Sequence, residues 1–181
     1  MYQGEKIYLT ALEKEDLPKL MVWRNNINFR KHFREYREIN TSMQNSWFEN
    51  KVLADPSTIM FAIRLVSDDS LVGCCGLCYI NWVQRNADLS LYIGYKDSYI
   101  DEEGFAEESC KLLFDYAFKE LALVKIWTEI YEFDNKKHKL YKELGMNIDG
   151  TLRKQYFHDG KWWSASILSI LDEEWRYEDE L

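Results

Sequence analysis

The alternation of apolar and polar positions divides the first half of the chain into short strands and amphipathic helices. Residues 6–12 alternate as in a half-buried strand, and acids with Pro18 then mark a helix start over 13–26. A second helix is predicted over 40–53, with Thr41 or Ser42 as its cap. Three apolar or alternating runs at 57–66, 70–80 and 86–95 are separated by polar turns and predict an antiparallel meander.

The second half continues with a long amphipathic helix from Gly104, a buried strand over 123–133 and a short helix that ends at Gly145. The last apolar segment, 150–171, predicts a hairpin that turns at Asp159-Gly160. We therefore expect an α+β fold with the order βααβββαβαββ. Its mixed, mostly antiparallel central sheet would have about seven strands and about four flanking helices, in a single domain over residues 1–181.

Composition agrees with a packed globule, because 46% of the 181 residues are hydrophobic and 30% are charged. The net charge of −8 disfavours nucleic acid as a partner, since phosphates attract basic surfaces, whereas a cationic partner would be steered in. The apolar runs are too short for a membrane span, and no charged-then-apolar leader opens the chain. We expect a cytoplasmic protein.

Four cysteines raise the question of a metal site. Three of them, Cys74, Cys75 and Cys78, lie in a segment that is predicted to be a strand, which places Cys74 and Cys78 on one face and Cys75 on the other. A tetrahedral site would need a fourth ligand and a loop. We therefore predict no metal.

Several local strings, in order along nearly the whole chain, resemble the GCN5-related N-acetyltransferase (GNAT) superfamily, in particular its ribosomal-protein N-terminal and spermidine acetyltransferase branch. The strings that carry the resemblance are "IYLTALEKEDLPKL" with "WRN", "INWVQRNADLSLYIG", "EGFAEES", "LYKELGM" and "DGKWW". The resemblance implies a GNAT-like fold, acetyl-CoA as cosubstrate and direct transfer of an acetyl group to a primary amine. The alternative is a catalytically silent relative that binds a ligand as a sensor or partner module.

The resemblance assigns coenzyme contacts. A helix N-terminus exposes unpaired N–H groups and a partial positive charge, which suit a pyrophosphate. Gly104 and Ala106 match the small residues of the family's pyrophosphate turn, with Phe105 between them. The resemblance also implies contacts at Leu91, Tyr92, Ile93 and Asn135.

Two features depart from the family pattern. Asp101 stands where the family has Gln or Arg, and two more acids follow it, so these acids either cap the helix without any bound anion or accompany a retained pyrophosphate. The family's coenzyme-binding Asn lies seven residues before Tyr141, where this chain has Asp134, and Asn135 is one step late.

The resemblance also assigns catalytic candidates. Tyr141 matches the family tyrosine near the coenzyme sulfur, where a phenol supplies a proton to the departing thiolate; the alternative is an ordinary core aromatic. Asp88 and Glu129 are candidates for the base that takes the proton of the amine, directly or through water. The three histidines lack a catalytic or metal-binding context, so we interpret them as surface residues.

The segment between the first two helices, residues 25–40, is expected to line the acceptor side. Its aromatic residues could stack on a substrate and its arginines could hold a phosphate or carboxylate, and the candidates are Phe29, Arg34 and Tyr36. A solvated loop with its aromatics tucked inward is the alternative. Amino-sugar nucleotides fit the arginines, whereas polyamines or a protein N-terminus fit the overall acidity, and the sequence leaves this choice open. A homodimer is the assembly that we consider.

Overall fold

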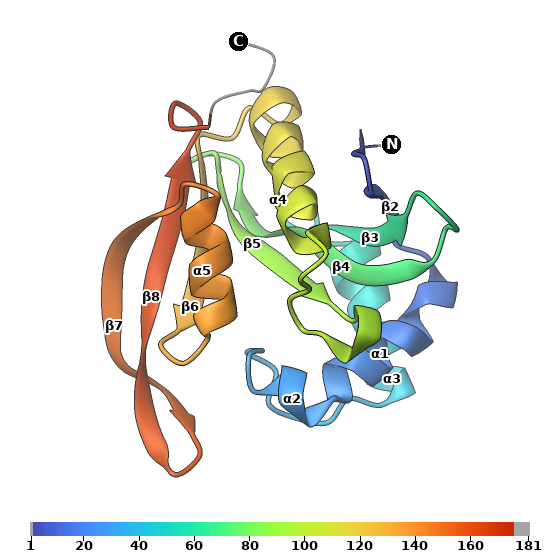
Figure 1. The fold of residues 1–181 in the computed structure, drawn as a ribbon, viewed down its shortest axis with the longest axis horizontal. Helices are drawn as coiled ribbons and strands as arrows, with labels where there is room; N and C mark the ends of the chain where they lie inside the picture. Colours follow the sequence, from blue (N-terminus) through green and yellow to red (C-terminus); the bar gives the residue numbers. More distant parts are fainter. Residues whose placement is uncertain (1, 176–181) are drawn as a thin grey trace.

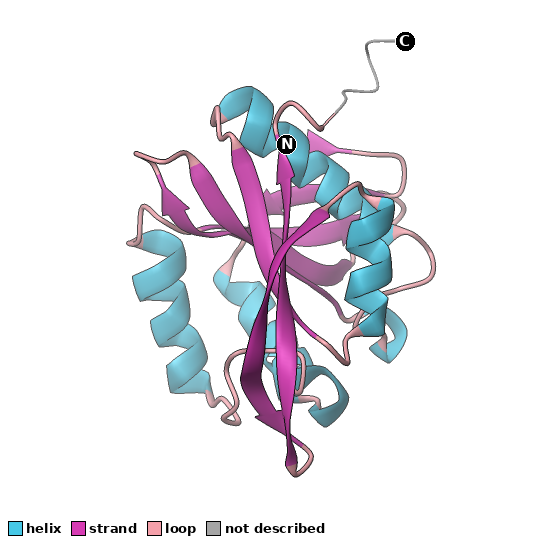
Figure 2. Ribbon diagram, turned by 90° about the vertical axis from the view of Figure 1, so that its left-hand side faces the viewer, coloured by secondary structure: helices cyan, strands magenta, loops and turns pink. Residues whose placement is uncertain are grey.

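A computed structural model describes residues 2–175 and shows one sheet with helices on both of its faces (Figures 1 and 2). The eight strands lie in the order β1-β2-β3-β4-β5-β6-β8-β7, and every neighbouring pair is antiparallel except β5 and β6. The strands are β1 Tyr2–Gln3, β2 Ile7–Ala11, β3 Ile59–Leu65, β4 Leu71–Asn81, β5 Asn86–Ile93, β6 Lys125–Tyr131, β7 Asn147–His158 and β8 Lys161–Leu171.

The helices are α1 Leu17–Asn25, α2 Ile27–Arg30, α3 Thr41–Trp47, α4 Phe105–Asp115 and α5 Asn135–Glu143. One π-helical segment continues α3 over Phe48–Leu53, and another continues α4 over Tyr116–Glu120. Short 3₁₀ turns occupy Lys14–Asp16 and Tyr95–Asp97. Within the described part of the chain, no helix is long and apolar enough to cross a membrane.

The predicted fold class is confirmed, with two additions. The two-residue strand β1 and the single-turn helix α2 are too short to produce a periodic pattern, and the sequence did not reveal them. The hairpin turn is found at Asp159 and Gly160, which both have positive φ angles (51° and 74°). Such angles are typical of the tight turns that connect twisted strands.

The site is created by a divergence between the two parallel strands. Residues of β5 pair with β4 from Asn86 to Ile93, but the ladder between β5 and β6 ends at the pair Asp88 and Trp127. Figure 1 shows the two strands separating beyond this point, with α5 alongside β6. The backbone edge of β5 after Asp88 therefore has no strand partner among residues 2–175, although Ile93 N donates to the Tyr99 carbonyl (2.9 Å).

Candidate functional site

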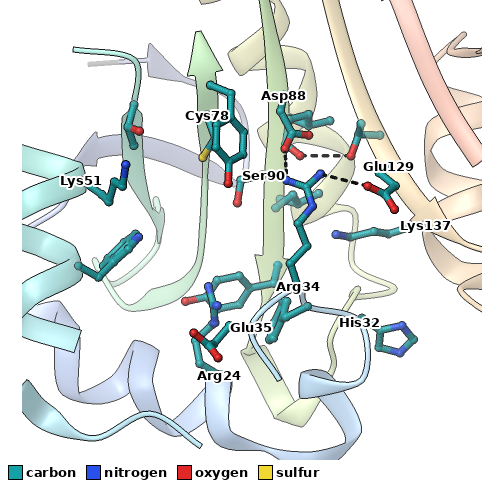
Figure 3. A pocket seen from close by; sticks show the side chains of 18 of the residues that line it. Arg24, His32, Arg34, Glu35, Lys51, Cys78, Asp88, Ser90, Glu129 and Lys137 are labelled. Carbon is teal, nitrogen blue, oxygen red and sulfur yellow. Dashed lines mark hydrogen bonds and ion pairs between the residues drawn. The ribbon is translucent and has the colours of Figure 1, made fainter. Parts of the chain in front are cut away.

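A cavity of about 310 Å³ lies where β5 and β6 diverge, and we call it the splay cavity. Both candidate bases line it, Asp88 from β5 and Glu129 from β6 (Figure 3). The segment between α2 and α3 closes one side with Arg34, and α5 contributes Lys137. The strands thus fix the two carboxylates, whereas a connecting segment supplies the opposing cation.

Arg34 joins the two carboxylates. Its Nη1 donates to Asp88 Oδ2 at 2.6 Å, and its Nη2 lies 4.0 Å from Glu129 Oε2 (Figure 3). The Asp88 side chain is 5% exposed, whereas that of Arg34 is 45% exposed. Burial raises the pKa of Asp88, and the charge of Arg34 opposes that rise. Asp88 Oδ1 is buried and has no hydrogen-bond partner among the described residues.

Two residues that the sequence did not assign to the site also lie there. Lys137 is half-buried at the cavity wall, and burial lowers the pKa of its amine although Asp134 and Asp88 oppose this. His32 also lines the cavity and stacks on Tyr99, with ring centroids 4.4 Å apart.

The interpretation of His32 as a surface residue is therefore wrong. The turn of α2 brings its ring inward, and His32 Nδ1 lies 3.2 Å from Asp134 Oδ2. Asp134 is the N-cap of α5 and accepts from Lys137 N at 3.1 Å. Burial works against the ionised form of Asp134, but His32 and Lys137 together hold its pKa below the usual value. Asp134 thus fixes both the start of α5 and the position of His32.

Tyr141 is fully buried in α5 and is not among the residues that line the splay cavity. Burial raises the pKa of its phenol well above the usual value, and Asp88, Asp134 and Cys110 raise it further. Tyr141 therefore keeps its proton at neutral pH. Its hydroxyl has no hydrogen-bond partner in the described part of the chain, which is costly for a buried donor. The role of Tyr141 as a proton donor stays a prediction.

The turn before α4 holds the three acids. Gly104 has φ +91°, a conformation that other residues rarely adopt, and Phe105 begins the helix. The Asp101 carboxylate accepts from Phe105 N at 2.7 Å and from Ala106 N at 2.8 Å. Asp101 is therefore the helix cap. Glu103 instead pairs with Lys96 at 2.9 Å.

The turn fits a pyrophosphate under one condition. The Asp101 carboxylate already uses the amides of Phe105 and Ala106, so an anion must displace it or use other donors. A cavity of about 480 Å³ opens in front of the turn, and α5 contributes Lys136 and Lys139 to its wall. These two lysines are the basic residues among those that line this cavity.

The remaining candidates separate into two groups. Leu91 and Tyr92 line the splay cavity, and Ile93 is fully buried just beyond them. Asn135 is exposed at the first position of α5 and lines none of the cavities described here. The structure thus brings the strand residues to the site, but Asn135 is turned away because Asp134 takes the cap position.

Of the three acceptor candidates, only Arg34 reaches the cavity. Phe29 is 2% exposed and packs in the core against Tyr99, because α2 turns its side chain inward. Tyr36 is 77% exposed and lines neither the splay cavity nor its neighbour. Phe33, another aromatic residue of the same segment, does line the splay cavity.

A second cavity of about 680 Å³ adjoins the first, between α1, α3 and the sheet, and we call it the acceptor cavity. Its walls combine apolar side chains such as Met43, Trp47 and Met60 with polar and charged ones. Within residues 2–175, no cluster of three or more His, Cys, Asp or Glu side chains is placed to hold a metal ion.

Comparison with known proteins identifies the family of the chain. Residues 6–147 match the family described as the acetyltransferase (GNAT) domain. The chain is 26% identical over 176 residues to a spermidine N(1)-acetyltransferase of Escherichia coli K12, covering 97% of this chain and 91% of the relative. It is 27% identical to a probable N-acetyltransferase of Bacillus subtilis, covering 95% and 97%.

Solved structures give the same result. A spermidine N-acetyltransferase from Vibrio cholerae in complex with CoA and spermine superposes with a TM-score of 0.83 at 25% identity, covering 93% of this chain and 96% of the other. A dodecameric structure of that enzyme gives a TM-score of 0.78 at 25% identity, covering 92% and 94%. The chain therefore belongs to the GNAT family and is an acetyl-CoA-dependent N-acetyltransferase.

Proposed function

We propose that the protein acetylates a primary amine bound at the splay cavity, with Asp88 as the base and Tyr141 as the proton donor. The observation that carries the proposal is the end of the β5–β6 ladder at Asp88. That break opens onto the carboxylates of Asp88 and Glu129. The Tyr141 hydroxyl is buried without a hydrogen-bond partner in the described residues, and the charge of Asp88 contributes to its raised pKa.

Acetyl-CoA supplies the acetyl carbon: the amine forms a C–N bond to it and loses one proton, while the C–S bond breaks and the thiolate gains one. Asp88 suits the first proton transfer because its raised pKa makes it a stronger base than an ordinary aspartate. Its unpartnered Oδ1 provides the free lone pair. Tyr141 suits the second transfer because burial keeps its phenol protonated.

The other groups at the cavity orient these two residues. Arg34 holds Asp88 through Oδ2 and favours its ionised form, so Arg34 acts as a positioning residue. Glu129 lies farther from that guanidinium, at 4.0 Å, and serves as a second carboxylate for the ammonium form of the incoming amine. Acetyl-CoA would lie along the backbone edge of β5 at Leu91 and Tyr92, which leaves the Tyr92 ring to the face of the sheet that Asp88 shares. The turn at Gly104, Phe105 and Ala106 and the lysines Lys136 and Lys139 would hold its pyrophosphate arm.

A thiol-release assay across a panel of amines tests the proposal. Spermidine and spermine belong in the panel because the names of the relatives include them, beside an amino-sugar nucleotide and a peptide with a free N-terminus. We expect release of CoA with at least one amine, and a product that is heavier by one acetyl group. If acetyl-CoA binds but no amine releases thiol, the proposal fails and the silent ligand-binding alternative is favoured.

A further inference from the structure

The acceptor cavity and the splay cavity form one continuous region, because they share seven lining residues along α1, α3 and the sheet. The shared residues are Arg24, Glu35, Trp47, Lys51, Cys78, Ser90 and Tyr92. A substrate whose amine lies at Asp88 would therefore extend into the acceptor cavity. The charges of that cavity then decide which substrates fit.

This region is locally basic in an acidic protein. Five basic side chains line the two cavities against four carboxylates, whereas the whole chain has a net charge of −8. The basic residues are Arg24, Arg34, Arg37, Lys51 and Lys137, and the acids are Glu35, Asp55, Asp88 and Glu129. A polyamine would bring further positive charge into this region.

Three of the five cations are already paired. Arg37 clamps Glu35 through two hydrogen bonds of 2.8 and 2.7 Å, which lower the pKa of Glu35 to about 2. Lys51 pairs with Asp55 at 2.9 Å. Arg34 pairs with Asp88 at 2.6 Å. These pairs cancel most of the charge that faces the cavities.

Arg24 is the basic residue of the acceptor cavity that has no ion-pair partner among the described residues. It is half-buried, and within residues 2–175 its guanidinium has neither an ion pair nor a hydrogen bond. Its ring neighbours are Phe33 at 4.6 Å and Tyr92 at 6.0 Å from the guanidinium carbon. The charge of Arg24 also helps to lower the pKa of Glu35, but the hydrogen bonds of that carboxylate go to Arg37. Rings attract a cation but do not neutralise it, and they leave the five N–H donors without acceptors.

The position of Arg24 sets the length of the ligand. Asp88, Ser90 and Tyr92 alternate along β5, so their side chains point to the same face of the sheet. Four residues of strand separate Asp88 from Tyr92, which is about 13 Å. Since Arg24 lies against Tyr92, an anion bound there would be on the order of 10 Å from an amine at Asp88.

We propose that the acceptor is a primary amine that carries a carboxylate or phosphate on the order of 10 Å from its nitrogen, with Arg24 as the anion-binding residue. The inference rests on the proposed acetyl transfer at Asp88. The apolar walls at Met43, Trp47 and Met60 suit an apolar chain between the two charged ends.

Matched substrates test this inference. For each chain length from 4-aminobutyrate to 10-aminodecanoate, we would measure kcat/KM for the aminocarboxylate, the aminoalkyl phosphate, the alkylamine and the diamine. A charge-assisted hydrogen bond predicts that an anionic substrate is preferred over the alkylamine by at least about 10-fold. The preference should be greatest at the chain lengths that span on the order of 10 Å and should be smaller for shorter and longer substrates. The better of the two anionic series identifies the anion.

Three variants locate the effect. In Arg24→Met, the ratio of the anionic substrate to the alkylamine should fall to about one, whereas Arg24→Lys should keep part of it. Arg30→Met is the matched control, because Arg30 pairs with Glu38 at 3.8 Å and lines neither cavity, and it should keep the full ratio. Calorimetry with the N-acetylated products provides a readout without turnover: the anionic product should bind more tightly than its neutral counterpart, except in Arg24→Met.

The outcomes separate this inference from the proposed function. Acetyl transfer with equal or greater preference for alkylamines or diamines would overturn the inference and leave the proposed function in place. An anionic preference that survives in Arg24→Met would also overturn it. Binding of the anionic product without transfer to any amine would support the role of Arg24 and refute the proposed function.

Discussion

At the scale of single residues, the buried hydroxyl of Tyr141 links stability to catalysis. Tyr141→Phe should lower turnover by roughly 10²-fold or more, because the thiolate loses its proton donor. The free energy of unfolding should stay unchanged or rise by about 1 kcal/mol, because a buried unpaired donor is removed. Steady-state kinetics and urea denaturation measure the two effects. Tyr116→Phe is the control, since Tyr116 packs against Tyr2 and Phe61 away from the cavity.

Unchanged turnover in Tyr141→Phe would mean that Tyr141 is a core residue without a role in proton transfer. A loss of turnover that is matched by a loss of stability would indicate a packing effect instead of proton donation. Coenzyme affinity should be nearly the same in the variant and the wild type.

The pKa of Asp88 gives a second prediction at this scale. A base works when it is deprotonated, so kcat/KM should rise with pH through this pKa, which burial places above the ordinary aspartate value of about 3.9. In Arg34→Met the rising limb should move to higher pH, because the cation that opposes the shift is gone. The pH profile of kcat/KM measures this, and Arg30→Met serves as the control. If the rising limb does not shift in Arg34→Met, the limb reports the pKa of a group other than Asp88.

At the scale of elements, the first turn of α4 competes with its expected ligand. In Asp101→Ala, the protein without coenzyme should lose about 0.5–2 kcal/mol of stability, because two N–H groups lose their cap. The same change should tighten CoA binding, because those donors become free for a phosphate. Thermal melting without coenzyme measures the expected loss of stability, and calorimetry with CoA measures the expected gain in affinity. Glu103→Gln is the control, since Glu103 pairs with Lys96. Weaker CoA binding in Asp101→Ala would mean that the carboxylate holds the turn in its binding shape.

At the scale of the whole molecule, acetyl-CoA should stabilise the fold by linkage. At a concentration 100 times the dissociation constant, the gain is about 2.7 kcal/mol, which raises the melting temperature. Differential scanning fluorimetry measures it, with adenosine as a control that lacks the pyrophosphate and pantetheine arms. An unchanged melting temperature at millimolar acetyl-CoA would contradict coenzyme binding. A homodimer stays a prediction, which light scattering after gel filtration can test.

The sequence alone determined the succession of the longer elements and the family resemblance. The order βααβββαβαββ follows from periodicity, and the hairpin turn at Asp159 and Gly160 follows from local turn chemistry. Both depend on residues that are neighbours in the chain. Gly104 at the start of the central helix was recognised because the string around it resembles the family's turn, and such a string is also local in the chain.

Only the tertiary structure decided which side chains meet at the cavity. Arg34 meets Asp88 across 54 positions of the chain, and His32 meets Asp134, because separate segments pack against the opened strands. The same packing buries Phe29 in the core. It also places Arg24 against the ring of Phe33, without an ion-pair partner among the described residues. Residue types and spacing do not encode such long-range distances, because burial and pairing depend on how distant elements are brought together.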